Sequence, residues 1–217
     1  MGDPQVSVIL PVYNAEKTLP ETLESLLVQH FEAFEIIAID DGSDDDTPAI
    51  LNTYANRDPR IQILSPGRQG LIGALNTGID HAKSDLIARM DADDFAHPDR
   101  FGLQYNFLQT FPDIALVSCL IRCFPEANVG KGFRIYEAWL NSLTTPEAIA
   151  REIFIESPVC HPSIMLRKSC LKIVGGYKDF GWAEDYDLWL RLHTSGMQFA
   201  KVPQVLHHWR ESPERLT

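Results

Sequence analysis

Short apolar runs alternate with segments of helical periodicity along the first 121 residues. Apolar runs of four to eight residues bounded by turn-forming residues are typical of buried strands. A regular alternation of strands and helices predicts a largely parallel sheet flanked by helices, although such an architecture does not by itself define a function. The five predicted strands are residues 6–11, 34–39, 61–64, 86–90 and 115–121.

Four helical segments are predicted between these strands. Leu19, Leu23, Leu26 and Leu27 form an apolar stripe, and Thr18 and Glu21 have the spacing of a capping box in front of it. Asp44 to Asp46 are predicted to lie in the first turn of the second helix, where the helix dipole favours acids. The third helix carries its apolar stripe from Ile72 to Ala82, and the fourth is expected over residues 98–110.

The pattern changes after Cys123. Residues 124–133 contain one proline and two glycines and are predicted to be a loop, followed by short helices at 134–143 and 146–154. This segment is either an insertion or lid over a site, or a packed connecting subdomain.

The remaining elements resume the earlier pattern. They are predicted as a strand at 163–166, helices at 168–174 and 184–192, and strands at 199–202 and 205–209. The tail, residues 210–217, shows no clear stop signal, which leaves open that the domain continues beyond it.

Composition narrows the class of protein. The 217 residues, 45% hydrophobic and 23% charged, suit one globular domain, and a net charge of −11 argues against general affinity for nucleic acid or an anionic membrane. No signal peptide and no apolar run near ~20 residues are visible, so no transmembrane segment is expected. No feature indicates an oligomeric state.

The four cysteines are scattered along the chain and form no CxxC pair. We interpret them as small buried residues in a reducing cytoplasm, in preference to disulfides or a zinc site. They are Cys119, Cys123, Cys160 and Cys170.

Three carboxylates, Asp91, Asp93 and Asp94, follow the fourth predicted strand directly. Ligands of open α/β sheets bind beyond the carboxyl ends of strands, and oxygen ligands suit Mg²⁺ or Mn²⁺. If the strand continued, Asp91 and Asp93 would share one face. The alternative is a solvated acidic turn in front of the helix that begins near Pro98.

A second acidic site opens the helix at residue 184. Asp185, Leu188, Trp189 and Leu192 fall on one helical face, so the carboxylate is predicted to point into the structure or a cleft, where it needs a partner. An acidic N-cap is the alternative interpretation.

Taken together, four blocks of this sequence resemble the family 2 glycosyltransferases, which have the GT-A fold. The resemblance runs from residue 6 to about residue 210 and is least diagnostic over 122–156. It implies an α/β fold with one mixed, mostly parallel Rossmann-like sheet and a helical acceptor-side insertion. The blocks are residues 6–14, 40–47, 74–78 continuing to 89–94, and 175–177 with 184–191.

The resemblance also implies an activity. A sugar would pass with inversion from a nucleoside diphosphate sugar, by default a uridine diphosphate sugar, to the hydroxyl of a sugar or glycan acceptor in polysaccharide or glycan assembly. Residues 1–121 would form the nucleotide-sugar-binding half of a single domain, and residues 122–217 the acceptor-side half. The protein would be cytoplasmic, with attachment to the inner face of the membrane as an alternative.

By the same resemblance, the donor site has named residues. Pro11, Tyr13 and Asp41 would line the base pocket, with Arg68 near the nucleotide, and Asp91 would approach the ribose or the metal.

The remaining roles fall to three acids. Asp93 would bind Mn²⁺ or Mg²⁺, Asp185 would be the general base, and Glu184 would lie beside it. The chemistry requires such groups independently, because a cation stabilises a diphosphate leaving group and a carboxylate can take the proton of the attacking hydroxyl.

One position departs from the family pattern. Many relatives carry a histidine just after the pair that corresponds to Trp209 and Arg210, whereas here Glu211 follows and His207 and His208 precede. The third metal ligand is therefore open. His161 fits an acceptor-side pattern or a structural role.

Three other functions compete with sugar transfer. A nucleotide-sugar-binding module without transfer activity is the main alternative. A nucleotidyltransferase would need a basic, glycine-rich loop after the first strand, and an Asp-x-Asp phosphatase would need its acids there, but Pro11 to Glu16 provide neither.

Overall fold

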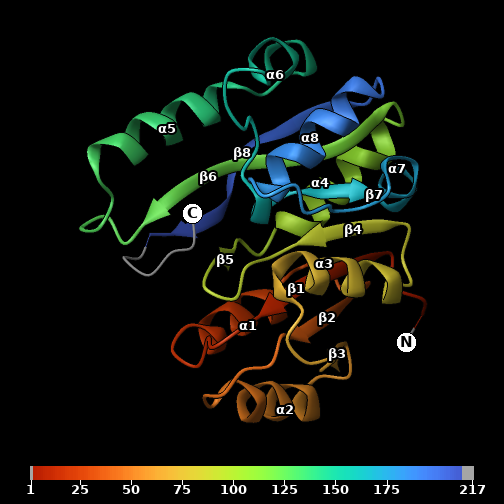
Figure 1. Ribbon diagram of the computed structural model, residues 1–217, viewed down its shortest axis with the longest axis vertical. Coiled ribbons are helices and arrows are strands. Elements are labelled where there is room, and N and C mark those ends of the chain that lie inside the picture. The colour runs from red at the N-terminus through yellow and green to blue at the C-terminus, as the bar shows by residue number, and fades with distance from the viewer. Residues whose placement is uncertain (1, 212–217) are drawn as a thin grey trace.

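One eight-stranded sheet organises the chain, and the computed structural model describes residues 2–211 (Figure 1). The strand order is β3-β2-β1-β4-β7-β6-β8-β5. The strands are β1 (Val6–Val12), β2 (Phe34–Asp40), β3 (Ile61–Leu64), β4 (Leu86–Arg89), β5 (Phe95–Ala96), β6 (Ile114–Phe124), β7 (Met165–Arg167) and β8 (Gln198–Arg210). The helices are α1 (Leu19–Leu27), α2 (Thr47–Arg57), α3 (Gly70–His81), α4 (Arg100–Thr110), α5 (Lys131–Ser142), α6 (Pro146–Glu152), α7 (Lys168–Val174) and α8 (Glu184–Thr194), with a 3-10 turn, η1, at His161–Ser163.

The sheet is mixed, as the sequence predicts. Strands β3, β2, β1 and β4 pair in parallel, whereas β7 runs antiparallel to both β4 and β6. Strand β8 is parallel to β6 and antiparallel to β5. The carboxyl ends of β1, β2 and β4 therefore lie at one edge, which is where a ligand site is expected.

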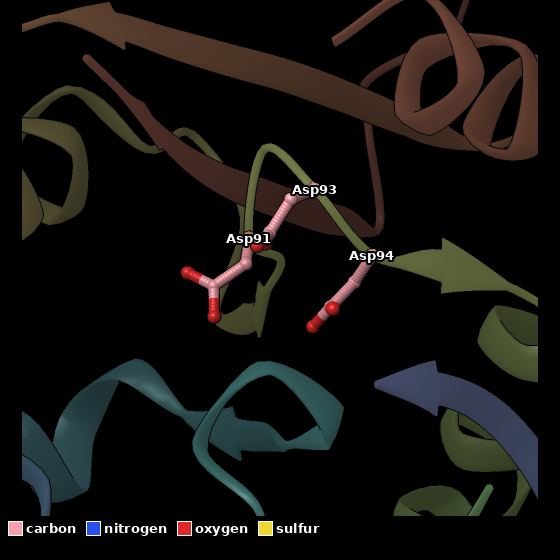
Figure 2. A group of neighbouring side chains, drawn as sticks. All are labelled: Asp91, Asp93 and Asp94. Carbon is pink, nitrogen blue, oxygen red and sulfur yellow. The ribbon is translucent and has the colours of Figure 1, made fainter. Parts of the chain in front are cut away.

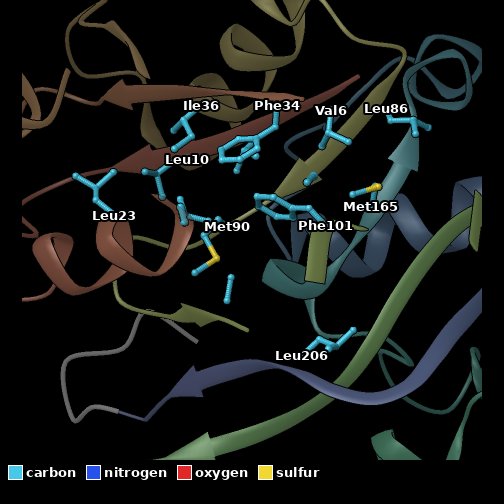
Figure 3. Close-up of a cluster of buried hydrophobic side chains, with 14 of the residues drawn as sticks. Val6, Leu10, Leu23, Phe34, Ile36, Leu86, Met90, Phe101, Met165 and Leu206 are labelled. Carbon is cyan, nitrogen blue, oxygen red and sulfur yellow. The ribbon is translucent and has the colours of Figure 1, made fainter. Parts of the chain in front are cut away.

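Apolar side chains on both faces of the central strands explain why helices cover both. In β1, Val8 and Leu10 pack into one core with α1, α2 and α4, and Ile9 packs into a second core with α3, α7 and α8. Figure 3 shows Leu10 in the first core together with Leu23 of α1 and Phe101 of α4. A strand buried on both sides has a continuous apolar sequence, so the run at residues 6–11 already indicated its central position.

The segment after Cys123 forms a separate small layer. Leu140 of α5 packs on Ile121 of β6, with Val129 of the intervening segment in the same cluster, and α6 follows α5 (Figure 1). Helix α5 begins at Lys131, three residues earlier than predicted, with Gly130 as its N-cap residue. Gly132, expected in a loop, lies inside the helix.

Thr18 is the N-cap residue of α1, as predicted, but the side-chain hydrogen bonds of a capping box are not formed. The Thr18 hydroxyl donates to the carbonyl of Ala92 at 2.9 Å, and the Glu21 carboxylate accepts from Arg210 at 2.6 Å. Both side chains thus bind the acidic turn and the last strand instead of the helix end. The three acids from Asp44 also precede α2 rather than forming its first turn, since the helix starts at Thr47.

Several strand boundaries differ from the predictions. Strand β5 was missed, because two residues carry no periodicity, and β8 is one continuous strand through Pro203. Strand β6 is longer than expected, and β7 begins at Met165 because His161–Ser163 forms the 3-10 turn. Most of the tail expected to lack a stop, residues 212–217, lies outside the described residues.

Two expectations from composition can be compared with the structure. The four cysteines are all buried, as expected for small core residues. Within residues 2–211, no helix combines the length and the apolar character that a bilayer span requires.

We predict that Gly78→Ala lowers the free energy of unfolding by about 1–2 kcal/mol. A Cβ atom at this position of α3 would lie 2.7 Å from methyl carbons of both Ile9 and Ile39, and overpacking costs more than the gain in helix propensity. The matched control is Gly102→Ala in α4, whose Cβ would meet only an ordinary contact, at 3.7 Å from Phe31, and which should stabilise the protein by about 0.5–1 kcal/mol. Urea denaturation measures both changes. A Gly78→Ala protein as stable as the wild type would show that α3 is less tightly packed than described.

Candidate active site

A cavity of about 1210 Å³ lies beyond the carboxyl ends of β1, β2 and β4. Asp93 and Asp185, which are far apart in sequence, both line it, so the two acidic sites predicted from the sequence open onto one space rather than onto opposite sides. The eight residues to which the resemblance assigns a donor, metal or catalytic role all line this cavity, whereas Asp94, His207 and His208 do not. The eight are Pro11, Tyr13, Asp41, Arg68, Asp91, Asp93, Glu184 and Asp185.

Three carboxylates converge at the floor of the cavity. Asp91, Asp93 and Asp94 each offer a ligand oxygen, and these oxygens lie within 4.8 Å of one another (Figure 2). Because β4 ends at Arg89, the acids lie on a turn and not on a continuing strand, so it is the turn that brings them together. Within the described residues, this is the only such group of potential metal ligands, and it contains no histidine.

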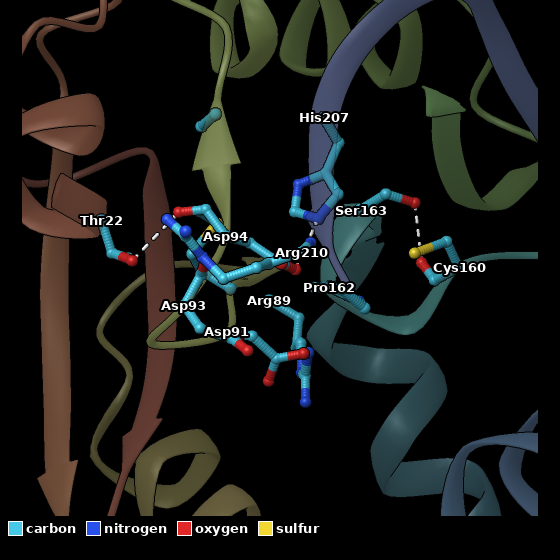
Figure 4. Close-up of polar contacts among 12 residues, drawn as sticks. Thr22, Arg89, Asp91, Asp93, Asp94, Cys160, Pro162, Ser163, His207 and Arg210 are labelled. Carbon is cyan, nitrogen blue, oxygen red and sulfur yellow. Dashed lines mark hydrogen bonds and ion pairs between the residues drawn. The ribbon is translucent and has the colours of Figure 1, made fainter. Parts of the chain in front are cut away.

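Asp94 is the structural member of the group. Its carboxylate is fully buried and accepts hydrogen bonds from His207 Nε2 at 2.8 Å and from the Arg210 backbone N–H at 2.7 Å (Figure 4). Burial and the neighbouring Arg100 guanidinium hold the pKa of His207 well below its usual value, so the imidazole is neutral. Its Nδ1 then accepts from Arg100 at 3.1 Å. His207 is therefore a core residue that supports the turn from behind.

Asp91 and Asp93 face the cavity in different electrostatic states. Asp91 forms an ion pair with the buried Arg89 guanidinium. Among residues 2–211 no such ion pair is formed by Asp93, and burial together with the charges of Asp94 and Asp91 raises its pKa to about 7. Three carboxylates crowded into one turn thus disfavour a negative charge on Asp93 in the metal-free protein, although Arg89 and Arg210 partly offset this effect. An all-oxygen donor set of this kind fits a hard divalent cation such as Mg²⁺ or Mn²⁺, whose charge would relieve the repulsion.

The region expected to bind the base is built around Tyr13. The Arg68 guanidinium carbon lies 3.4 Å from the Tyr13 ring centroid, so a base stacking on that face would have to displace it. Asp41, which is buried, accepts hydrogen bonds from the backbone N–H groups of Gln69 at 2.6 Å and Gly70 at 3.0 Å. Asp41 therefore also fixes the loop that carries Arg68.

The acids of α8, Glu184 and Asp185, line the same cavity. The predicted helical face is confirmed, because Leu188, Trp189 and Leu192 are fully buried and Asp185 occupies the first turn on the same face. The Asp185 carboxylate accepts from the backbone N–H of Tyr186 at 2.7 Å.

Glu184 has a different environment. Its carboxylate lies 3.5 Å from His161 Nδ1, and His161 Nε2 lies 2.7 Å from the Tyr177 hydroxyl. Burial alone would raise the pKa of Glu184, but the hydrogen bond and charge of His161 outweigh it and lower the pKa. Glu184 is thus held by a buried histidine, whereas Asp185 is not.

The structure adds cavity residues to which the sequence analysis gave no role. Arg89 is buried at the end of β4, and its Nε has no hydrogen-bond partner within residues 2–211. A charged residue inside an otherwise apolar run was the signal that could have revealed it. Phe133, Tyr136 and Trp209 also line the cavity. The first two belong to the segment whose pattern was least diagnostic.

Comparisons with known proteins agree with this geometry. The family model described as Glycosyl transferase family 2 matches residues 7–174. The EpsE protein of Bacillus subtilis (strain 168) is 35% identical over 216 residues, which cover 97% of this chain and 74% of EpsE. The amylovoran biosynthesis glycosyltransferase AmsE of Erwinia amylovora is 30% identical over 203 residues, 92% of this chain and 74% of AmsE.

Two solved structures share the fold. S. aureus TarS 1–349 in complex with UDP-GlcNAc superposes with a TM-score of 0.80 at 20% identity, over 97% of this chain and 60% of TarS. The mannosyltransferase PcManGT of Pyrobaculum calidifontis, in complex with GDP-Man and Mn²⁺, gives 0.75 at 22% identity, over 99% of this chain and 59% of PcManGT. At these identities the likeness concerns the fold alone, and it confirms the expected mixed α/β architecture. The chain spans about three fifths of the length of each.

We predict that Asp94→Asn lowers the free energy of unfolding by about 2–4 kcal/mol. The amide could accept only one of the two hydrogen bonds that the carboxylate now accepts, and its NH₂ group would face the other buried donor, from His207 or Arg210. Chemical denaturation measures the loss. Wild-type stability in this variant would mean that the buried contact does not hold the turn.

We predict the opposite effect for Asp93→Asn in metal-free protein. Because the pKa of Asp93 is raised to about 7, the folded state binds more protons than the unfolded state between about pH 4 and pH 7, and wild-type stability falls as the pH rises through that range. At pH 8 the variant should be more stable by about 1–3 kcal/mol, after allowance for the partial exposure of Asp93. The difference in stability between the variant and the wild type should become smaller towards pH 5. Parallel melting curves in EDTA at the two pH values test this, and a gain independent of pH would contradict it.

Proposed function

This chain belongs to glycosyl transferase family 2, and on that premise we propose that it transfers a sugar from a nucleoside diphosphate sugar to a hydroxyl of a glycan acceptor, with inversion at the anomeric carbon. The observation that carries the proposal is the placing of Asp93 and Asp185 around one cavity. In this proposal, residues 1–121 form the donor half and the following residues the acceptor-side half.

The donor would lie between β1 and the acidic turn. Pro11, Tyr13 and Asp41 would line the base pocket, and Arg68 would move from the Tyr13 ring to the nucleotide. TarS was solved with UDP-GlcNAc and PcManGT with GDP-Man, so the fold accommodates more than one base. Uridine remains our first choice for this chain.

The acidic turn would hold Mn²⁺ or Mg²⁺ through Asp93, with Asp91 at the ribose or the metal. PcManGT was solved with Mn²⁺, which supports this choice. When bound, the cation would offset the negative charge that develops on the departing diphosphate. Arg89 pairs with Asp91, whereas Asp93 forms no such ion pair among residues 2–211, and a bound cation would favour its charged form.

Asp185 would act as the general base. As the acceptor oxygen bonds to the anomeric carbon, the bond from that carbon to the diphosphate oxygen breaks and the hydroxyl proton passes to the Asp185 carboxylate. One direct displacement of this kind inverts the centre. The hydrogen bond from Tyr186 uses one of about four acceptor positions of that carboxylate, which leaves capacity for the acceptor. Glu184, held by His161, would orient the acceptor side.

The biological setting that we propose is polysaccharide or glycan assembly. AmsE is named for amylovoran biosynthesis, and 92% of this chain aligns with it. The partners in this proposal are the nucleoside diphosphate sugar and a sugar or glycan acceptor.

We predict that Asp185→Asn reduces sugar transfer by about 10²–10⁴-fold, the usual contribution of a general base. Binding of the donor with Mn²⁺ should stay within about twofold, since the amide keeps the size of the side chain and lies on the acceptor side. Nucleotide release in the presence of acceptors measures transfer, and titration calorimetry measures binding.

The control for this variant is Asp80→Asn, an equal change of charge at an exposed position of α3. It should leave both quantities unchanged. Transfer at the wild-type rate by Asp185→Asn would remove the assigned base. A wild-type protein that binds uridine, guanosine or thymidine diphosphate sugars, yet neither hydrolyses nor transfers them, would instead be a binding module.

A further inference from the structure

We propose that the part of the cavity facing α5 binds an uncharged sugar ring of the acceptor, against a wall of three aromatic side chains. The wall consists of Phe133 and Tyr136 from α5 and Trp209 from β8, and is called the aromatic wall below. The inference rests on the proposed transfer reaction and specifies which class of acceptor the site takes.

The volume of the cavity leaves room for a second ligand. Small-molecule sites commonly enclose about 300–1,000 Å³. This cavity measures about 1210 Å³ and continues from Tyr13 and the acidic turn to the aromatic wall and the start of α8. A donor bound near Tyr13 and Asp93 would therefore leave the far part of the cavity open to an acceptor.

The aromatic wall is held in place by its own contacts. The Phe133 and Trp209 rings meet edge to face with centroids 6.1 Å apart, and Tyr136 lies 6.4 Å from Trp209. Tyr136 also stacks on Trp139 at 5.7 Å and donates its hydroxyl to the Ser157 carbonyl at 3.0 Å. A wall that is fixed before binding loses little side-chain entropy when a ligand arrives.

Aromatic faces suit one face of a pyranose ring. The face of an aromatic ring carries partial negative charge, and the C–H bonds on one side of a sugar present partial positive charge to it. The hydroxyls at the edge of that sugar are hydrogen-bond donors, for which carboxylates are strong acceptors. Glu156, Glu184 and Asp185 supply such carboxylates on the same part of the cavity.

The arginines of the lining are engaged mainly by Tyr13 and the acidic turn. Arg68 covers Tyr13, Arg210 donates to the Asp93 carbonyl, and Arg89 pairs with Asp91, although its charge also reaches Glu184. A diphosphate would meet them there, together with Lys17.

The acceptor side is dominated by carboxylates. Its lining holds Glu156, Glu184 and Asp185, and His161 beside them is already engaged with Tyr177 and Glu184. A uronic acid or phosphorylated sugar placed there would bring a further negative charge against these groups at low dielectric. The arrangement therefore favours a neutral acceptor over an anionic one.

Paired methyl glycosides test this inference without an aromatic aglycone that would itself stack on the wall. The pairs are methyl β-glucoside with its glucuronide and methyl β-galactoside with its galacturonide. Binding to the full chain is measured by ligand-observed NMR titration, with Mn²⁺ and uridine diphosphate present. We expect each neutral member to bind at least about fivefold more tightly than its uronate.

Variants of α5 test whether the aromatic wall is responsible for the binding of neutral glycosides. Phe133→Leu keeps an apolar side chain but loses the aromatic face, and should weaken binding of the neutral glycosides about five- to tenfold without changing the affinity for nucleotide and Mn²⁺. Ile135→Ala, on the same helix but 62% exposed and outside the cavity lining, is the matched control and should retain binding of the neutral glycosides.

The outcomes separate this inference from the proposed function. Equal or tighter binding of the uronates, no binding of any neutral glycoside, or unchanged binding by Phe133→Leu overturns the aromatic acceptor site. Failure of every nucleoside diphosphate to bind with Mn²⁺ overturns the proposed function, and the glycoside titrations can be read independently of that result.

Discussion

The acidic turn depends on one buried contact, between the Asp94 carboxylate of the turn and the His207 imidazole of β8. The two residues are 113 positions apart, and the short pairing of β5 with β8 lies beside them. Because Asp94 also accepts a hydrogen bond from the Arg210 backbone N–H, strand β8 fixes the position of the acidic turn. The acidic turn forms the floor of the cavity, so β8 also fixes that floor. An uncompensated carboxylate could not remain at this depth without such partners. The neutral state of His207, which burial and Arg100 impose, lets it donate to Asp94 and accept from Arg100 at the same time.

The three acids of the turn differ in how their charges are compensated. Asp94 is satisfied by hydrogen bonds and Asp91 by Arg89, whereas burial and its two acidic neighbours raise the pKa of Asp93. Above neutral pH the Asp93 carboxylate is charged, which weakens the metal-free protein, and the same charge would attract a cation. Proteins often keep features that lower stability at functional sites.

The places of Asp91, Asp93 and Asp185 were predictable because these acids follow a strand or open a helix, whereas Pro11, Tyr13, Asp41 and Arg68 were indicated only by the resemblance to family 2 glycosyltransferases. The apolar run that ends at Asp91 and the helical face shared by Asp185 and Trp189 both report burial directly, and burial decided where these side chains point. The role of Thr18 was not predictable in the same way, since its hydroxyl satisfies a carbonyl 74 positions away rather than its own helix. The aromatic wall was not predicted from the sequence, for a similar reason. Phe133 lies in a segment that was predicted to be a loop, and its partner Trp209 comes from a distant strand. Local pattern identifies buried faces, whereas contacts between distant segments decide which of them meet.

The proposed transfer requires a cation and a general base to lie close to the same sugar. The most direct measurement is a crystal structure of the protein with Mn²⁺ and an unhydrolysed nucleoside diphosphate sugar, with manganese located by its anomalous scattering. We expect the manganese peak at the Asp93 carboxylate and the diphosphate, and the anomeric carbon on the side of the cavity that Asp185 faces. A manganese peak away from Asp93, or a donor whose anomeric carbon is turned away from Asp185, would contradict the account.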